Sequence, residues 1–399
     1  MKWSNGMARI LIASFGLTPH NMRLMPWRTV LEVADGLRVK GHTVTVLSIA
    51  DKGRPPIEAP ERGIFTIQRQ RAVDMRQKLL ALAGRSGFDV MFIPVSWSRN
   101  RLMRDLLAEF DGIRIAYMPG SVFELGQLLP LLGKMPLRSL LPYLAQATFP
   151  SPLLRRSLTD LGVGAVITNS DYSRDHLARR IAQPVVTIAP GRDPVISQPE
   201  GGSKSARLHA EAPYFLFMGP PLAIRGVFVL LDAYLKVAND PDMPPLLCLF
   251  RSDAHLDMPK LKSMIEQRWS NDKLHFVWDS LEPSALQSHI EHAMAIVMPF
   301  LVVPSEIPLA VYEAAGMGKT VITTRPHGTG DFVSKFGETV KVGNVSALAS
   351  ALLRTARAAR NGPSSGNGKA LTAHEGLETW QATADRWEML AIEMGVHAK

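Results

Sequence analysis

Residues 298–325 read MPFLVVPSEIPLAVYEAAGMGKTVITTR, and this stretch decides the fold. Its apolar start predicts the end of a buried strand, which runs into an irregular loop containing proline and serine. Residues 309–317 then predict a short helix, and a glycine turn leads into a second apolar strand over residues 320–324. A strand, a helix and a strand in this order predict part of a parallel α/β sheet.

Two carboxylates bracket this helix: Glu306 lies near the loop-to-helix junction and Glu313 lies inside the helix. Both can project into the crevice at the carboxyl ends of the strands, where open α/β sheets bind ligands. The N-terminal end of the helix suits an anion such as a diphosphate, and a carboxylate suits sugar or ribose hydroxyls. The pattern favours a nucleotide or sugar site. The alternative is an ordinary exposed helix face, because glutamates seven apart share a face of any helix.

Composition narrows the class of protein. The 399 residues, 46% of them hydrophobic, suit two domains. The single cysteine, Cys248, excludes a disulfide framework and a cysteine zinc cluster, and fits a reducing cytoplasm. No secretory signal and no apolar run of roughly 18–20 residues is present, so we expect a protein that is soluble or peripheral to a membrane. The net charge of +9 favours an anionic partner.

The same composition argues against two kinds of partner. The basic residues lack interleaved aromatics on a strand and lack a helix-turn-helix pattern, so nucleic acid is not expected. The 11 histidines show no metal-ligand spacing, so no metal is expected either.

The rest of the chain alternates strands with helices, which predicts doubly wound parallel sheets. A helix after Ser170 is expected to have Ser173 as its N-terminal cap. The loop after the first strand lacks Gly-x-Gly-x-x-Gly, so a classical NAD site is not expected. Strands are expected near residues 8–13, 42–48, 88–95, 113–118, 165–170 and 214–218, and helices near 27–39 and 226–238.

Two short motifs imitate other sites. Gly318-Lys319-Thr320 resembles the end of a P-loop, but a strand follows it where a P-loop has a helix. Asp240-Pro241-Asp242 resembles a metal-binding Asp-x-Asp, but it lies in a proline-rich turn between a helix and a strand, so we expect a solvated turn.

The central stretch resembles the donor-binding signature of family-4 glycosyltransferases, which have the GT-B fold. The matching residues are Pro304-Ser305-Glu306, Glu313-Ala314 and Gly318-Lys319-Thr320-Val321. The family separates its two glutamates by seven residues and this chain by six. Either the loop is one residue shorter with Glu306 still in place, or Ser305 occupies the first-carboxylate position.

The resemblance implies two Rossmann-like, doubly wound parallel-sheet domains that face each other across a cleft. It implies an acceptor-binding domain over residues 1–196, a linker over 197–209 and a nucleotide-sugar donor domain over 210–375. It also implies a terminal helix over 376–399 that crosses back to the first domain.

The resemblance also implies roles for particular residues. Arg225 would bind the donor diphosphate and Glu313 the ribose hydroxyls, while Glu306 would be the catalytic carboxylate at the hydroxyls of the transferred sugar. Where the family has a Gly-Gly pair in the first loop, this chain has Gly16 alone. The family's acceptor histidines are missing from their usual positions, and Pro220 stands in place of the first cation. Further donor contacts are expected at Gly16, Gly219, Ser305, Ile307, Pro308 and Leu309, and acceptor contacts at His20 and Glu124.

The function implied is that of a metal-independent, retaining, hexosyltransferase-type enzyme. It would move a sugar from a UDP- or GDP-linked donor, without a cofactor, to a hydroxyl of a lipid-linked or saccharide acceptor in polysaccharide or glycolipid synthesis. The departures from the signature leave two alternatives: a catalytically degenerate relative acting as a partner or regulator, and a sugar-nucleotide epimerase.

The leucine-rich residues 125–158, with interspersed cations, also have two interpretations. They either sit at anionic headgroups on the inner face of the plasma membrane or form helices packed on the first sheet.

Overall fold

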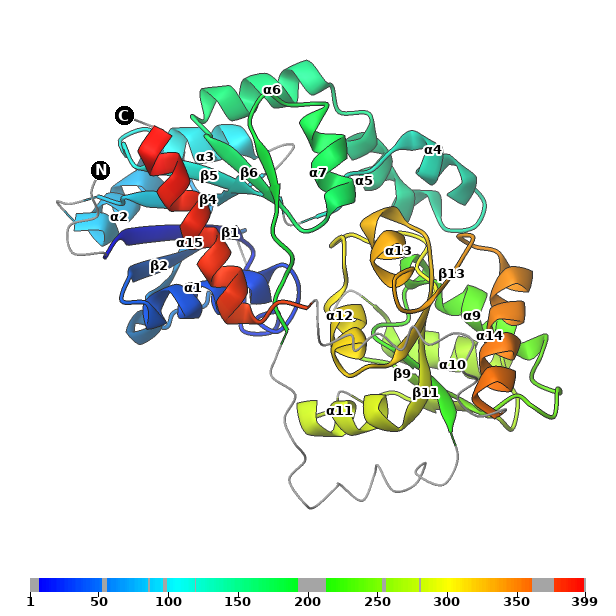
Figure 1. Cartoon of the computed structure of the whole chain (residues 1–399). Coiled ribbons are helices and arrows are strands. Elements are labelled where there is room, and N and C mark those ends of the chain that lie inside the picture. Colours follow the sequence, from blue (N-terminus) through cyan, green and yellow to red (C-terminus); the bar gives the residue numbers. More distant parts are fainter. Residues whose placement is uncertain are drawn as a thin grey trace.

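Two parallel sheets, each with helices on its faces, make up the protein (Figure 1). The computed structural model describes residues 7–51, 56–84, 87–95, 99–118, 120–192, 213–252, 256–279, 281–360 and 377–397. The predicted linker over residues 197–209 lies outside these ranges.

The first sheet is followed along the chain by the second. The first domain contains β1 (Arg9–Phe15), α1 (Trp27–Val39), β2 (Thr43–Ala50), β3 (Ile64–Gln68), α2 (Ala72–Ala83), β4 (Val90–Pro94), α3 (Asn100–Leu106), β5 (Ile113–Tyr117), α4 (Leu125–Leu128), α5 (Leu137–Ala147), α6 (Ser151–Asp160), β6 (Ala165–Thr168), α7 (Asp171–Ala178) and β7 (Val185–Thr187). The second contains β8 (Tyr214–Met218), the 3₁₀ turn η5 (Ala223–Arg225), α9 (Val227–Leu235), β9 (Leu246–Leu249), α10 (Met258–Arg268), β10 (Leu274–Val277), α11 (Pro283–His292), β11 (Ala293–Met298), α12 (Leu309–Gly316), β12 (Thr320–Thr324), α13 (His327–Val333), β13 (Glu338–Val340) and α14 (Val345–Arg360). The helix α15 (Trp380–His397) follows.

The strand order confirms the doubly wound prediction. The first sheet runs β3-β2-β1-β4-β5-β6-β7 and the second β10-β9-β8-β11-β12-β13, and the neighbouring strands in both are parallel. In each sheet the order reverses direction beside the first strand, between β1 and β4 and between β8 and β11. Ligands of open α/β sheets bind outside the carboxyl ends of the strands at these reversal points.

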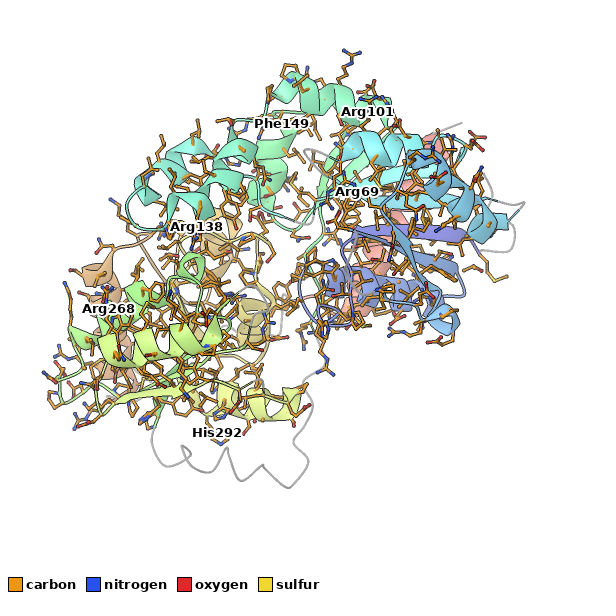
Figure 2. All side chains as sticks on the ribbon, turned by 180° about the vertical axis from the view of Figure 1, so that it is seen from behind. Arg69, Arg101, Arg138, Phe149, Arg268 and His292 are labelled. Atoms are coloured by element: carbon orange, nitrogen blue, oxygen red, sulfur yellow. The ribbon has the colours of Figure 1, made fainter. Side chains whose placement is uncertain are left out.

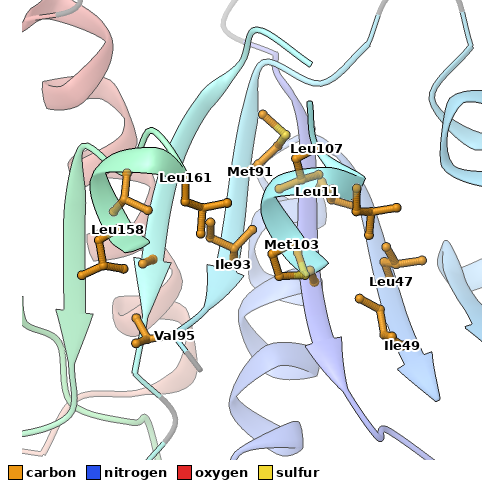
Figure 3. Packing of buried hydrophobic residues seen from close by; sticks show 14 of the residues in the cluster. Leu11, Leu47, Ile49, Met91, Ile93, Val95, Met103, Leu107, Leu158 and Leu161 are labelled. Atoms are coloured by element: carbon orange, nitrogen blue, oxygen red, sulfur yellow. The ribbon is translucent and has the colours of Figure 1, made fainter. Parts of the chain in front are cut away.

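Alternating side chains of the strands build a separate hydrophobic cluster on each face of a sheet. On β1, Leu11 belongs to one cluster and Ile12 to the other, as the two-residue period of a strand requires. Figure 3 shows one of these clusters, which includes Leu11 of β1, Met103 of α3 and Leu158 of α6. Burial on both faces explains why the strands read as continuous apolar runs in the sequence.

The helix α7 has its N-terminal cap three residues earlier than the sequence predicts. Its N-terminal cap is Ser170, whose hydroxyl accepts a hydrogen bond from the Ser173 amide at 3.1 Å, so the expectation that Ser173 is the cap is wrong. Ser170 has the extended backbone of a cap, with φ −148° and ψ 156°, whereas Ser173 already lies inside the helix.

Residues 125–158 divide between the two domains. The helix α6 packs on the first sheet through Leu154 and Leu158. In contrast, α4 and α5 bury Leu128 and Leu140 against Leu301 and neighbouring residues of the second domain. Within the described ranges, no helix is both long and apolar enough to span a membrane.

The helix α15 crosses back from the second domain and packs on α1 of the first (Figure 1). Trp387 is 2% exposed, and its ring lies 4.7 Å from that of Phe92 and 5.5 Å from that of Tyr117. The two helices approach so closely that a Cβ added at Gly36 would lie 2.6 Å from the Cβ of Ala384. The core of the first domain therefore includes a helix from the far end of the chain.

Trp387→Ala should lower the free energy of unfolding of the first domain by about 3–5 kcal/mol, because it leaves a cavity against Phe92 and Tyr117. Urea unfolding followed by far-UV circular dichroism measures this change. Ile392→Ala is the matched control on the same helix, since that side chain is 44% exposed, and it should cost only about 0.5 kcal/mol. Equal losses in the two variants would contradict the buried anchor.

Candidate active site

The loops that follow β8 and β11 meet at the reversal point of the second sheet. The amides of Leu301 and Val302 both donate to the carbonyl oxygen of Ile224, at 2.8 Å and 3.1 Å. Between them, Gly226 has φ +73°, and a Cβ there would lie 1.8 Å from the carbonyl oxygen of Pro299. Only glycine permits this approach, so it fixes the two loops as one surface.

Arg225 lies over this surface, on η5. A Cβ added at Gly219 would lie 2.5 Å from its Nη1, and its Cζ is 5.8 Å from the ring centroid of Phe300. Gly219, with φ +127°, has a backbone that other residues avoid, and its missing side chain is what leaves room for the guanidinium. The structure thus brings together the predicted donor residues Arg225 and Gly219 at the carboxyl ends of β8 and β11.

Glu313 lies on α12, where its side chain is 32% exposed and faces the first domain. Its Oε1 accepts from Nη1 of Arg28 at 3.2 Å. Arg28 comes from the first turn of α1, and its guanidinium lies 5.5 Å from the ring of Trp380 on α15. The predicted ribose carboxylate therefore lies where three elements of the fold converge.

The start of α12 offers backbone donors to an anion. Its N-cap is Pro308, and no side chain caps the first turn, which begins at Leu309. Ile307 is 4% exposed and Ser305 is half-buried, so the side chain of Ile307 packs inside the protein and supports the loop. Together with the partial positive charge of a helix N-terminus, this geometry suits a phosphate near Leu309.

Glu306 is in a different environment from Glu313. Its side chain is 1% exposed, and its carboxylate accepts from the hydroxyls of Ser170 and Ser173 and from the Gly328 amide. Burial raises the pKa of Glu306, and these hydrogen bonds act in the opposite direction. The carboxylate thus bonds to α7 of the first domain and to α13 of the second.

In the part of the chain that the structure describes, no hydrogen bond joins the three contacts predicted in the first domain, Gly16, His20 and Glu124, to one another. Gly16 has φ +68° at the end of β1, and its amide donates to the Ile49 carbonyl. His20 is exposed on the turn that follows. Glu124 pairs with His176 of α7 at 2.8 Å.

Sequence reasoning missed a cationic group at the carboxyl ends of the first sheet. Asp51, after β2, pairs at 3.4 Å with both Arg69 and Arg99. Arg99 also lies 4.9 Å from the ring of Phe15, the last residue of β1. Charged residues placed directly after buried strands were the available signal, and Arg28 opposite Glu313 gave none because it lies 285 residues away in the chain.

The two imitating motifs have structural roles. Nζ of Lys319 donates to the carbonyl oxygens of Glu291 and Ala293 and so closes the end of α11. Asp240 and Asp242 pair with Arg357 and Arg360 of α14, which makes them more than a solvated turn. Among the described residues, no group of three or more histidine, cysteine, aspartate or glutamate side chains is placed to hold a metal ion.

Comparisons with known proteins bear on the fold of the chain and on the family that its second domain resembles. Residues 212–357 match the family model described as Glycosyl transferases group 1. No curated protein matches the chain.

Solved structures share its whole architecture. Sucrose-phosphate synthase from Thermosynechococcus elongatus has 16% identity and a TM-score of 0.68, with 98% of this chain and 100% of that chain covered. A glycosyltransferase from Rickettsia africae has 14% identity and a TM-score of 0.65, with 97% and 98% covered. HepE of Anabaena, solved with UDP and glucose, has 11% identity and a TM-score of 0.67, with 96% and 99% covered. At these identities the likeness shows the fold, which is GT-B.

Gly226→Ala should destabilise the second domain more than a positive φ alone explains, because the new methyl group meets the backbone of Pro299. Gly133→Ala is the matched control: its φ is +81° and a Cβ there meets nothing within 4 Å, so only the backbone strain of about 1–2 kcal/mol is expected. Thermal unfolding of both variants gives the difference. If the two melting temperatures fall equally, the close approach of the two loops is wrong.

Proposed function

We propose that the protein transfers a sugar from a nucleotide-sugar donor to a hydroxyl acceptor, because residues 212–357 match the family model described as Glycosyl transferases group 1 and the chain has the GT-B fold. The single observation that carries this proposal is the position of Arg225 over the joined loops at the end of β8 and β11. A guanidinium over the ring of Phe300, in the loop that leads to the N-terminus of α12, provides positive charge for a donor diphosphate.

In this proposal the second domain holds the donor. Arg225 binds the diphosphate with the amides at the start of α12, and Glu313 accepts hydrogen bonds from the ribose hydroxyls. The reaction then proceeds by positioning and by stabilising the charge of the leaving diphosphate, without a metal. We propose a UDP- or GDP-linked hexose as the donor, with retention of anomeric configuration.

Glu306 and Glu313 differ in what a sugar would have to displace. For Glu313, which is partly exposed, a ribose hydroxyl competes with the guanidinium of Arg28 at 3.2 Å. For Glu306 to reach the transferred sugar as the catalytic carboxylate, it would first have to leave Ser170 and Ser173. The donor assignment therefore depends on Glu313 and Arg225.

We further propose that the acceptor is a lipid-linked or growing saccharide, presented at the cytoplasmic face of a membrane. Support comes from a leucine face, made of leucines on α4, α5 and α6 and between α4 and α5, that are between 40% and 55% exposed. Exposed cations lie in the same segment, and one of them, Arg138, is labelled in Figure 2. The leucines are Leu125, Leu129, Leu132, Leu137, Leu141 and Leu153, and the cations are Lys134, Arg138, Arg155 and Arg156.

The donor site is tested by calorimetry and thermal shift with UDP, GDP and their sugars. One nucleotide should raise the melting temperature of the wild type, because a ligand that binds only the folded state stabilises it. Glu313→Ala and Arg225→Ala should each weaken that nucleotide about 10- to 100-fold, since each loses charged hydrogen bonds.

Two variants serve as controls for the donor site. Glu338→Ala removes a carboxylate on the edge strand β13 that pairs with Arg354, and Arg268→Ala removes a guanidinium on α10 (Figure 2). Both should bind the nucleotide as the wild type does. Unchanged affinity in Glu313→Ala would remove its assignment. A wild type that no nucleotide stabilises would favour the degenerate relative, and sugar isomerisation with the donor alone would favour the epimerase.

Membrane contact is tested by cosedimentation with vesicles of phosphatidylglycerol and of phosphatidylcholine. The wild type should bind the anionic vesicles more tightly, and added salt should weaken this binding. Replacing Leu129, Leu137 and Leu141 with glutamine should weaken it more than ten-fold, since each leucine contributes on the order of 1 kcal/mol or more.

The control for the leucine face replaces Met389 and Ile392 with glutamine. These apolar side chains on α15 are 57% and 44% exposed, so this variant also replaces exposed apolar side chains with amides, away from the leucine face. This variant should bind vesicles as the wild type does. Equal binding by the leucine variant and the wild type would exclude the leucine face as the contact.

A further inference from the structure

The Glu306 carboxylate is buried at the junction of the two domains. Its Oε1 accepts from the Ser170 hydroxyl at 2.6 Å and from the Gly328 amide at 2.9 Å, and its Oε2 accepts from the Ser173 hydroxyl at 2.5 Å. Ser170 and Ser173 belong to the start of α7 in the first domain, and Gly328 belongs to α13 in the second. One side chain therefore joins both domains.

The backbone of Glu306 is held in an unfavourable conformation by the first domain. Its φ is +52°, in a region that residues with a side chain avoid at a cost of about 1–3 kcal/mol. Its amide donates to the Ser121 hydroxyl at 2.9 Å, and the Ser121 amide donates to the Pro304 carbonyl at 3.0 Å. The hydroxyl of Thr329 donates to the carbonyl oxygen of Glu306. Contacts from both domains thus support the strained backbone.

The surroundings of the carboxylate leave no space for a sugar. A Cβ added at Gly328 would lie 2.5 Å from Oε1 of Glu306 and 2.5 Å from the Ser170 hydroxyl. Even a methyl group does not fit beside the carboxylate. In this arrangement a sugar hydroxyl reaches Glu306 only if α7 and α13 separate.

We propose that Glu306 is an interdomain latch: a positioning residue that fastens the β11–α12 loop, residues 299–308, to α7 of the first domain. The hydrogen bonds of the latch do not depend on the proposed function. Its effect on donor binding rests on that function, because the same loop leads into the predicted phosphate site at the start of α12. When the latch is closed, the β11–α12 loop is held at a fixed distance from the first domain. Opening it releases the carboxylate and its two serines together.

The latch is tested first without any ligand, by small-angle X-ray scattering on Ser173→Ala, Glu306→Gln and the double variant. Each single variant should increase the radius of gyration, because the loop is no longer fastened to α7. The double variant should increase it no further, since both changes break one interaction. Far-UV circular dichroism checks that each variant is folded, and Ser334→Ala, an exposed serine of α13's C-cap, is the control that should match the wild type.

Calorimetry with UDP and with UDP-glucose then separates a latch from a sugar contact. With a latch, Ser173→Ala and Glu306→Gln change the two affinities in the same way. If only Glu306→Gln lost affinity for UDP-glucose relative to UDP, while both variants kept the wild-type radius, the latch would be overturned and Glu306 would be a sugar contact. If the wild type bound neither ligand but the radii still increased, the latch would stand and the donor assignment would fall.

Discussion

The hydrogen bonds of the β11–α12 loop are the constraint on which the rest of the site depends. On one side, the amides of Leu301 and Val302 bind the loop that carries Arg225; on the other, Glu306 and Pro304 bind the first domain. A loop of ten residues tied at both ends has little freedom of its own. Its position is therefore set by the relative position of the two domains, and the start of α12 moves with it.

This arrangement places the two predicted glutamates in opposite physical situations. Glu313 is partly exposed and pairs with the guanidinium of Arg28. In such an environment a carboxylate exchanges partners at a low cost in free energy. Glu306 is fully buried among neutral donors, where losing one donor leaves a costly unpaired charge. The same residue type is suited to ligand exchange in one position and to holding structure together in the other.

The sequence predicted well what is local. The 3.6-residue period defined α1 at Trp27–Val39, and the apolar runs marked the strands, because burial on both faces of a parallel sheet leaves a direct trace in the chain. The signature around Glu306 and Glu313 located the loop and the helix. What it left out is the partner of each carboxylate, since Ser170 lies 136 residues from Glu306 and Arg28 lies 285 residues from Glu313. Contacts at that separation depend on how the domains pack.

The path of the chain through α15 has a consequence for how the protein is made. Trp387 completes the core of the first domain, yet it is synthesised after the whole second domain, β8 to α14. On the ribosome the second domain, which is continuous in sequence, can finish folding before Trp387 is made. During that time the apolar side chains that Trp387 covers in the first domain, such as Phe92, are still exposed. Chaperones that recognise apolar surface would meet the first domain during that interval, so the domain that is translated first is the one that matures last.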